Sequence, residues 1–389
     1  MRNPLSDVVQ EIKPSGIRKF FDVVSEMPDA ITLGVGEPDF ETPGFIREAG
    51  IKSLNQGHTF YTSNLGMKEL REEICEFAKE KQGLVYDPLT EVLVTVGGSE
   101  AIDIACRALL NPGEEAIIPE PCYVSYVPCV KLAGGVPVSI PLQEKNEFRL
   151  TAGELRAAIT PKSKLLFLTF PNNPTGAIMS REDLEALREI IIEHDLIVIS
   201  DEIYSALSYH GGGHVSIAQL PGMQERTIVI NGFSKAYAMT GWRLGYAMGP
   251  QLIIKQMTKI HQFAIMCAPT TSQYAAIQAL RFGDSDVQRM CAAYNQRRRF
   301  LLQAFRRMQL PCFEPFGAFY VFPNISEFGM TSEEFATRFL TEEKVAVVPG
   351  TAFGECAEGF IRISYAYSIE TLQEAMRRLE HFITTLRQG

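Results

Sequence analysis

The chain has 389 residues, of which 46% are hydrophobic and 21% charged, and this composition excludes a largely disordered protein. Its 46 acidic and 37 basic residues give a net charge of -9 and are scattered along the sequence, so no broad nucleic-acid-binding surface is predicted. No apolar run reaches about 18 residues, and the N-terminus lacks a long apolar stretch. We therefore expect neither export nor a membrane span, and a cytoplasmic location.

The eight cysteines lie far apart, without a Cys-x-x-Cys pair or a nearby histidine cluster. This pattern indicates reduced, mostly buried thiols. His210 and His214 flank a Gly-Gly-Gly run, which fits a flexible surface turn better than a metal clip. The sequence predicts no metal site.

The chain begins with about 45 residues that are too short to fold alone and contain the turn-rich segment LGVGEPDFETP, residues 33–43. From about residue 91 to residue 200, short β-branched runs alternate with amphipathic stretches, as expected when helices connect parallel strands. We predict an α/β fold with a doubly wound, mostly parallel sheet whose strands are buried on both faces. The candidate strands are residues 92–96, 115–118, 165–169, 196–200 and 227–230.

Helices are predicted between these strands and in the C-terminal part. One begins near Ser180, which can cap it, and is followed by early acidic residues and an apolar stripe. After about Asp284 the sequence changes to a basic amphipathic stretch, a region punctuated by Pro and Gly, and a final helix near residues 369–386. We expect a large domain of residues 46–284 and a smaller α+β domain of residues 285–389, against which the N-terminal segment 1–45 packs.

The segment TVGGSEAIDIACRALL, residues 95–110, has the pattern of a strand that ends in a Gly-Gly turn before a helix. The backbone N–H groups of Gly98, Ser99 and Glu100 would then point outward at the positive end of the helix, where they can bind a phosphate. An ordinary strand-to-helix turn is the simpler explanation of this segment taken alone.

Two further polar motifs follow predicted strands, at the edge where an α/β sheet binds its ligands. PNNPTG places Asn173 there to donate to a phenolate or carboxylate oxygen, although turn chemistry explains Asn-Pro and Thr-Gly equally well. SDEIYSAL puts Asp201 and Tyr204 near the same edge, where the aspartate could instead cap a helix.

The segment SKAYAMTGWRLGY, residues 234–246, also follows a strand and carries Lys235 and Arg243 at a predicted turn. Desolvation near other cationic groups lowers the pKa of a lysine and makes its amine nucleophilic toward an aldehyde, as Schiff-base formation requires. The alternative, an exposed lysine beside a solvated arginine, fits this segment less well.

Six motifs, in this order, are similar to those of the class I/II aminotransferases, which have the fold-type I architecture and use pyridoxal 5′-phosphate (PLP). The motifs are GEPDF, GGSEA, NNPTG, DEIY, SKAYAMTGWRLGY and FIRIS. The match runs nearly end to end, and the chain resembles the aspartate and aromatic aminotransferases of that family. The resemblance implies a large sheet domain and a smaller α+β domain formed by both termini.

The resemblance implies that Lys235, Asp201 and Tyr204 are the catalytic group. Lys235 would form the Schiff base with PLP, and Asp201 would pair with the protonated pyridine nitrogen, so that the ring can accept electrons. Tyr204 and Asn173 would hydrogen-bond the cofactor's 3′-oxygen, and Tyr123, in PEPCYVSY, would stack on the ring.

Further contacts with the cofactor phosphate are implied for Arg243 and Ser234, alongside the amides at the start of the helix, including those of Ser99 and Glu100. Tyr61, in FYTSNLG, matches the tyrosine that reaches the phosphate of the neighbouring subunit, so the resemblance implies a homodimer. One departure is Gly232, where many relatives carry a phosphate-binding hydroxyl, and there the remaining donors must suffice.

For the substrate, Arg362 in FIRIS matches the arginine that holds the α-carboxylate in a fork-to-fork pair. Asn173 and the Gly36 amide would assist it, with Tyr123 beside the substrate. On the local sequence alone, a surface ion pair of Arg362 is the alternative.

These residues imply transfer of the α-amino group of an L-amino acid to a 2-oxo acid by a ping-pong mechanism. Relatives that prefer aspartate often carry a basic residue where this chain has Ser99. We therefore expect aromatic or other neutral donors, with 2-oxoglutarate as the acceptor.

Two alternatives stay open. A PLP-dependent carbon–sulfur β-lyase shares the lysine chemistry, but GEPDF and SGIRKFFD, residues 15–22, favour the aminotransferase. A non-catalytic PLP-binding regulator would need a fused DNA-binding module, and we expect none ahead of Asp7 or after Arg387.

Overall fold

The structure is a computed structural model that describes residues 2–14, 16, 27 and 29–388. Apart from Gly16, the segment SGIRKFFD lies outside the described residues.

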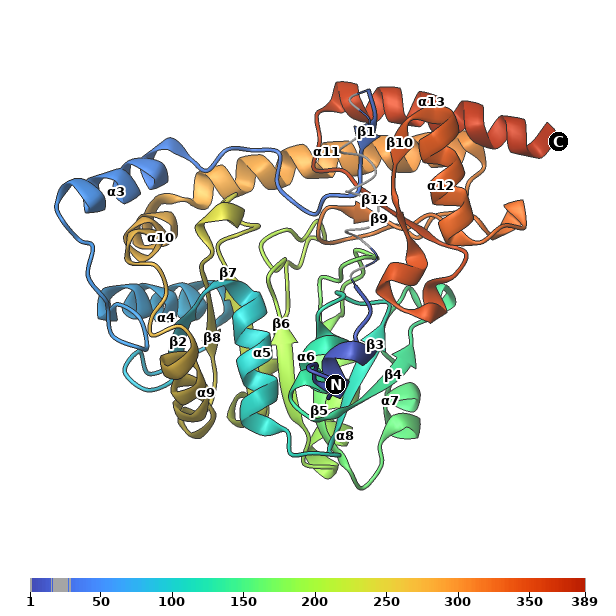
Figure 1. The fold of residues 1–389 in the computed structure, drawn as a ribbon. Helices are drawn as coiled ribbons and strands as arrows, with labels where there is room; N and C mark the ends of the chain where they lie inside the picture. The colour runs from blue at the N-terminus through green and yellow to red at the C-terminus, as the bar shows by residue number, and fades with distance from the viewer. Residues whose placement is uncertain (1, 15, 17–26, 28, 389) are drawn as a thin grey trace.

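A seven-stranded sheet, in the order β2-β8-β7-β6-β5-β3-β4, forms the centre of the larger part (Figure 1). Its strands are β2 (Val92–Thr95), β3 (Glu115–Glu120), β4 (Val136–Pro141), β5 (Ser163–Leu168), β6 (Ile197–Asp201), β7 (Thr227–Gly232) and β8 (Gly245–Met248). Strands β3 to β7 run parallel to one another, whereas β8 is antiparallel to both β2 and β7.

The five predicted strands are present, and β4 and β8 are additional. β4 lies at the edge of the sheet, is largely exposed and contains Pro137 and Pro141, which weaken the sequence signal of a strand. β8 begins two residues after the SKAYAMTGWR segment, whose small residues, including Gly241, indicate a turn.

Helices cover both faces of this sheet (Figure 1). They are α3 (Gly44–Asn55), α4 (Lys68–Gln82), α5 (Gly97–Leu109), α6 (Tyr126–Leu132), α7 (Ala152–Ala158), α8 (Arg181–Glu193), α9 (Gln251–Ala264) and α10 (Thr270–Phe282). Successive side chains of a strand point to opposite faces. In β5, Leu165 and Phe167 therefore join the core formed with α5 and α6, while Leu166 and Leu168 join the core formed with α7 and α8.

Helix α8 begins where the sequence predicts. The Ser180 hydroxyl accepts from the Asp183 N–H at 3.1 Å, and the Asp183 carboxylate accepts from the Ser180 N–H at 2.8 Å. This reciprocal capping satisfies two backbone donors at the helix start and confirms the predicted boundary.

The smaller part consists of C-terminal helices packed on two short sheets (Figure 1). Its helices are α11 (Asp284–Met308), α12 (Ser332–Glu343) and α13 (Ile369–Gln388). One sheet has the antiparallel order β11 (Val348–Pro349), β12 (Ile361–Ser364) and β9 (Tyr320–Val321). The other pairs β1 (Ile31–Thr32) in parallel with β10 (Val345–Ala346).

The N-terminal segment contacts both parts, because β1 pairs with β10 whereas α1 (Asp7–Glu11) packs near α6. Helix α11 starts close to residue 285, where the smaller domain is predicted to begin. We keep the division into segments 1–45, 46–284 and 285–389 as a proposal. None of the described helices is both long and apolar enough to span a membrane.

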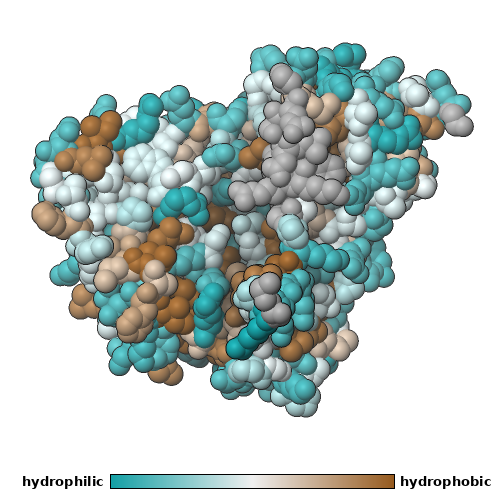
Figure 2. Space-filling view, viewed as in Figure 1, coloured by the Kyte–Doolittle hydropathy of each residue, from teal (hydrophilic) through white to brown (hydrophobic). Residues whose placement is uncertain are grey.

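Several large apolar side chains are exposed on the side of the molecule that carries α3 and α9, where Figure 2 shows hydrophobic surface. The segment after α3 and the segment after α9 lie together, because Thr270 donates to the Phe60 carbonyl at 2.7 Å and Asn64 donates to the Met266 carbonyl at 2.8 Å. The exposed apolar residues of these two segments and of the last turn of α9 are Phe60, Tyr61, Phe263, Ile265 and Met266.

Candidate active site

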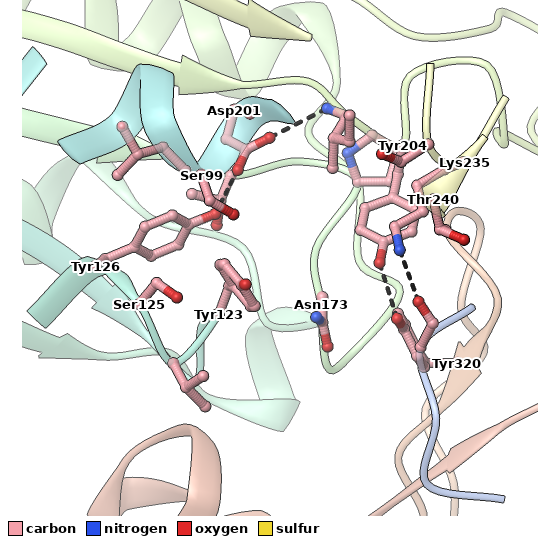
Figure 3. A pocket seen from close by; sticks show the side chains of 18 of the residues that line it. Ser99, Tyr123, Ser125, Tyr126, Asn173, Asp201, Tyr204, Lys235, Thr240 and Tyr320 are labelled. Carbon is pink, nitrogen blue, oxygen red and sulfur yellow. Dashed lines mark hydrogen bonds between the residues drawn. The ribbon is translucent and has the colours of Figure 1, made fainter. Parts of the chain in front are cut away.

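The polar motifs meet in one cavity of about 530 Å³ at the edge where β5, β6 and β7 end (Figure 3). Parallel strands bring their carboxyl ends to the same edge, so residues distant in sequence converge there. All predicted site residues except Glu100 and Tyr61 line the cavity. The predicted lining residues are Gly36, Gly98, Ser99, Tyr123, Asn173, Asp201, Tyr204, Ser234, Lys235, Arg243 and Arg362.

Lys235 follows β7 and faces the cavity, where its Nζ donates to the Gly36 carbonyl at 2.6 Å. Burial lowers the pKa of Lys235 from 10.5 to about 8, while Glu37 opposes this effect and Arg362 adds to it. The lysine keeps partial exposure on its cavity side. Its amine is therefore accessible, and a larger fraction of it is neutral at ordinary pH than of an exposed lysine, which favours its action as a nucleophile.

Asp201, at the end of β6, is a buried carboxylate. Its two oxygens accept from the Tyr126 hydroxyl at 2.8 Å and the Ile203 N–H at 3.1 Å. Burial raises the pKa of Asp201 despite these bonds. Among the described residues no basic side chain forms an ion pair with it, so a cation delivered by a ligand would stabilise its charge.

Tyr126 is a site residue that the sequence reasoning missed. It lies in the same PEPCYVSY motif as Tyr123, and the two rings meet edge to face with centroids 5.7 Å apart. The motif was available as a signal, but the hydrogen bond to Asp201 depends on how α6 packs beside β6. The missed lining residues also include Ser125, Thr240 and Tyr320.

At one end of the cavity, the first turn of α5 faces Arg243. Gly97 begins this helix with a φ of +77°, and a Cβ there would come within 2.7 Å of the Arg243 guanidinium. The backbone conformation therefore favours glycine, and any larger residue would also displace the Arg243 guanidinium. Helix amides, a guanidinium and the Ser234 hydroxyl on one wall form a site suited to an anion such as a phosphate.

The side chain of Glu100 lies outside this cavity lining. Its carboxylate accepts from the Val96 N–H at 2.5 Å and pairs with Nδ1 of the fully buried His261 at 2.6 Å. Glu100 thus holds the first turn of α5 in place, and the predicted use of its backbone amide stays a proposal.

At the opposite end, Arg362 of β12 is buried beside two aromatic rings. Its guanidinium carbon lies 4.5 Å from the Tyr320 ring centroid and 4.7 Å from that of Phe353. It donates to the Asn173 side-chain oxygen at 2.8 Å and to the Gly34 carbonyl, while its Nε has no hydrogen-bond partner among the residues that the structure describes. A buried donor without a partner is costly, so the site favours an anionic ligand that supplies acceptors.

Two predicted positions lie in different surroundings. Tyr61 is 81% exposed and away from the cavity, in the segment between α3 and α4. Gly232 is tightly enclosed, because a Cβ there would meet Gly245 Cα at 3.0 Å and the Ile203 side chain at 3.1 Å. The close packing of β7 on β8 explains why this chain carries no hydroxyl side chain at position 232.

The cavity therefore combines a nucleophilic amine, a buried carboxylate that lacks a cation, an anion cradle and a buried arginine. On an α/β sheet edge, these features define a transferase whose aldehyde cofactor bears a phosphate and a basic ring nitrogen. PLP has all three groups, and the residues present fit it.

Comparisons with known proteins agree with this class. The family model "Aminotransferase class I and II" matches residues 28–379. An aspartate aminotransferase of Pyrococcus abyssi is 48% identical, and an aromatic-amino-acid aminotransferase of Thermococcus litoralis is 45% identical, each over 97% of both chains. The solved aspartate aminotransferase of Thermus thermophilus with maleate superposes with a TM-score of 0.93 at 40% identity, covering 98% of this chain and 100% of that one.

The chain belongs to the class I and II aminotransferase family. It has the fold-type I α/β architecture and is a PLP-dependent enzyme that transfers amino groups between amino acids and 2-oxo acids. The predicted family, fold class, cofactor and enzyme class are thereby confirmed.

Proposed function

We propose that this aminotransferase acts on aromatic or other neutral L-amino acids, with 2-oxoglutarate as acceptor, and that Lys235, Asp201 and Arg362 carry the reaction. When bound, PLP supplies an aldehyde that condenses with amines and a ring that accepts electrons. Lys235 Nζ would hold the cofactor through that aldehyde and, when its amine is free, would take the proton from the substrate Cα and later return it. The observation that carries these roles is the convergence of Lys235 and Asp201 in one cavity.

The other residues bind and orient. Asp201 holds the proton of the ring nitrogen, supported by the Tyr126 hydroxyl. Tyr204 and Asn173 would donate to the 3′-oxygen, Tyr123 would lie against the ring, and Ser99, Ser234, Arg243 and the amides of Gly98 and Glu100 would hold the phosphate. Arg362 binds the substrate α-carboxylate, with Asn173 and the Gly36 amide beside it.

The donor class rests on the charges that line the cavity. Its only described basic lining residues are Lys235, Arg243 and Arg362, and each already has a role. Ser99 adds a hydroxyl and no positive charge to the lining, while Ile102 and Tyr123 add apolar surface. A neutral side chain therefore binds without leaving a buried charge unpaired.

We also propose a cytoplasmic homodimer in which Tyr61 completes the neighbouring site. The exposed apolar patch around Phe60, Tyr61 and Phe263 is the kind of surface that a second copy covers. Two variants can test this directly: Tyr61→Ala, which should be impaired, and Lys235→Ala, which should be inactive. Mixed and refolded together, they should regain activity, because a heterodimer holds one site with both native residues. A monomer in sedimentation experiments, or no regain, would contradict the proposal.

Lys235→Ala is the test of the catalytic assignment. Borohydride reduction of the wild-type protein with PLP should fix the cofactor to the peptide that contains residue 235, as read by mass spectrometry. The variant should show no labelled peptide and lose nearly all turnover. Lys255→Ala, which removes an exposed lysine on α9, is the matched control and should behave like wild type. Labelling elsewhere in the wild type would overturn the assignment.

A donor panel tests the substrate class. Phenylalanine, tyrosine, leucine and aspartate would each be offered with 2-oxoglutarate and then with pyruvate, and the product oxo acid measured. Aspartate as the sole good donor would refute the preference for neutral donors. Release of pyruvate and ammonia from cystathionine without an oxo-acid acceptor would instead indicate a carbon–sulfur β-lyase.

A further inference from the structure

Tyr320, on β9, is a buried tyrosine that touches several parts of the site at once. It is 1% exposed, and its hydroxyl lies 2.8 Å from the hydroxyl of Tyr204 (Figure 3). Its ring lies under the Arg362 guanidinium at 4.5 Å. Strand pairing fixes this arrangement, because Tyr320 is the direct partner of Ser364 at the end of β12, the strand that carries Arg362.

The Tyr320 hydroxyl also lies next to Gly36, whose carbonyl binds the Lys235 amine. A Cβ built on Gly36 would lie 2.3 Å from the Tyr320 oxygen, so the phenol occupies the space next to this glycine. The Gly36 carbonyl in turn accepts from Lys235 Nζ. One side chain therefore lies against residues at both the cofactor side and the carboxylate side of the cavity.

The number of hydrogen bonds that a phenol can donate determines which of Tyr204 and Tyr320 is the donor in the bond between them. Each phenol has one O–H to donate and can accept from others. When Tyr204 donates to a ligand oxygen, its proton is committed, and the 2.8 Å contact requires Tyr320 to be the donor. A phenol that accepts a hydrogen bond becomes a stronger donor, because the chain of bonds is cooperative.

We propose that Tyr320 is a positioning residue of the transamination site, whose hydroxyl strengthens the bond from Tyr204 to the cofactor's 3′-oxygen and whose ring orients Arg362 for the substrate carboxylate. This rests on the proposed roles of Tyr204 and Arg362. The hydroxyl and the ring have separate functions, so two substitutions can separate them.

Tyr320→Phe removes the hydroxyl and keeps the ring. The absorbance of the bound cofactor should then titrate at a higher pH, by roughly half to one unit, because the 3′-oxygen is less well stabilised as an anion. The KM for the amino donor should change by less than about twofold, since the ring under Arg362 remains. Tyr320→Leu removes both features and should also raise KM roughly 3- to 30-fold.

Tyr365→Phe is the matched control. Tyr365 is equally buried and its hydroxyl donates to the Ala318 carbonyl at 3.2 Å, outside the cavity lining. The Tyr365→Phe variant should lose a similar hydrogen bond without shifting the pH at which the absorbance of the bound cofactor changes. An unmoved titration in Tyr320→Phe, or an equal shift in Tyr365→Phe, would overturn the proposal. If the wild-type protein itself showed no cofactor absorbance, the proposed cofactor roles would fail instead.

Discussion

The cavity has an arginine at each of its two ends, and the two arginines lie in opposite environments. Arg243 is exposed and shares its end with the helix amides of α5 and with hydroxyl groups. Arg362 is 2% exposed and lies against two aromatic rings, and burial lowers its pKa. The first end has several donors that substitute for one another, whereas the second depends on one desolvated group.

This difference indicates which substitutions should weaken ligand binding most. Water screens an exposed charge, so its loss is partly replaced by solvent and by neighbouring donors. A buried guanidinium with an unpartnered Nε gains much more from a correctly placed carboxylate. We therefore expect substitutions near Arg362 and the buried Asp201 to have larger effects than matched substitutions at the phosphate end.

Apart from the loss of Lys235, the largest effect is expected for Asp201→Asn. The amide is similar in size but cannot hold a proton on the ring nitrogen as a carboxylate does, so kcat should fall on the order of 10²–10³-fold, as when a preorganised charge-stabilising group is removed. Tyr126→Phe removes only one hydrogen bond to Asp201 and should cost less than about tenfold. Steady-state kinetics of both variants would decide, and an asparagine variant within threefold of wild type would refute the role of Asp201.

Arg362→Lys against Arg243→Lys tests the comparison of the two ends directly. Lysine cannot form the bidentate pair with a carboxylate, so Arg362→Lys should raise the KM of the amino donor roughly 10- to 100-fold. Arg243→Lys keeps a positive charge among redundant donors and should weaken PLP binding by less than about tenfold. Equal losses at the two ends would mean that burial does not set the difference.

Gly97→Ala probes the close approach of α5 to Arg243. The alanine must adopt a φ of +77° and displace the guanidinium, so PLP affinity should fall roughly 5- to 30-fold. Gly98→Ala is the matched control, since its Cβ would meet only Ile230 at 3.5 Å. The dissociation constant of PLP, measured by fluorescence quenching, should separate the two variants. Equal losses would contradict the steric argument.

The smallest effect concerns pH. Only the neutral amine of Lys235 attacks the aldehyde, and its pKa is lowered to about 8, so the reactive fraction grows as pH rises through that value. Capture of PLP by the cofactor-free protein should accelerate about tenfold between pH 7 and pH 9 and then level off. Nα-acetyl-lysine, as control, should keep accelerating above pH 9. The same continued rise in the protein would contradict a lowered lysine pKa.

The sequence predicts the cofactor end well because its residues follow strands of the large sheet. Asp201 ends β6 and Lys235 comes shortly after β7, so the rule that carboxyl ends of parallel strands meet was enough to bring them together. Tyr126 and Tyr320 were missed because their roles depend on contacts with Asp201 and Tyr204, which are distant in sequence.

By itself, the sequence determined the order of the motifs, the doubly wound sheet and the chemistry of the cavity, since hydrophobic periodicity and residue type are local properties. Only the tertiary structure decided that Arg362 is buried against Tyr320, that its Nε lacks a partner, and that Glu100 turns toward His261 and away from the cavity. These features arise where short strands and helices from distant parts of the sequence pack together. Many contacts between residues far apart in the sequence fix their positions jointly. No local pattern encodes those contacts.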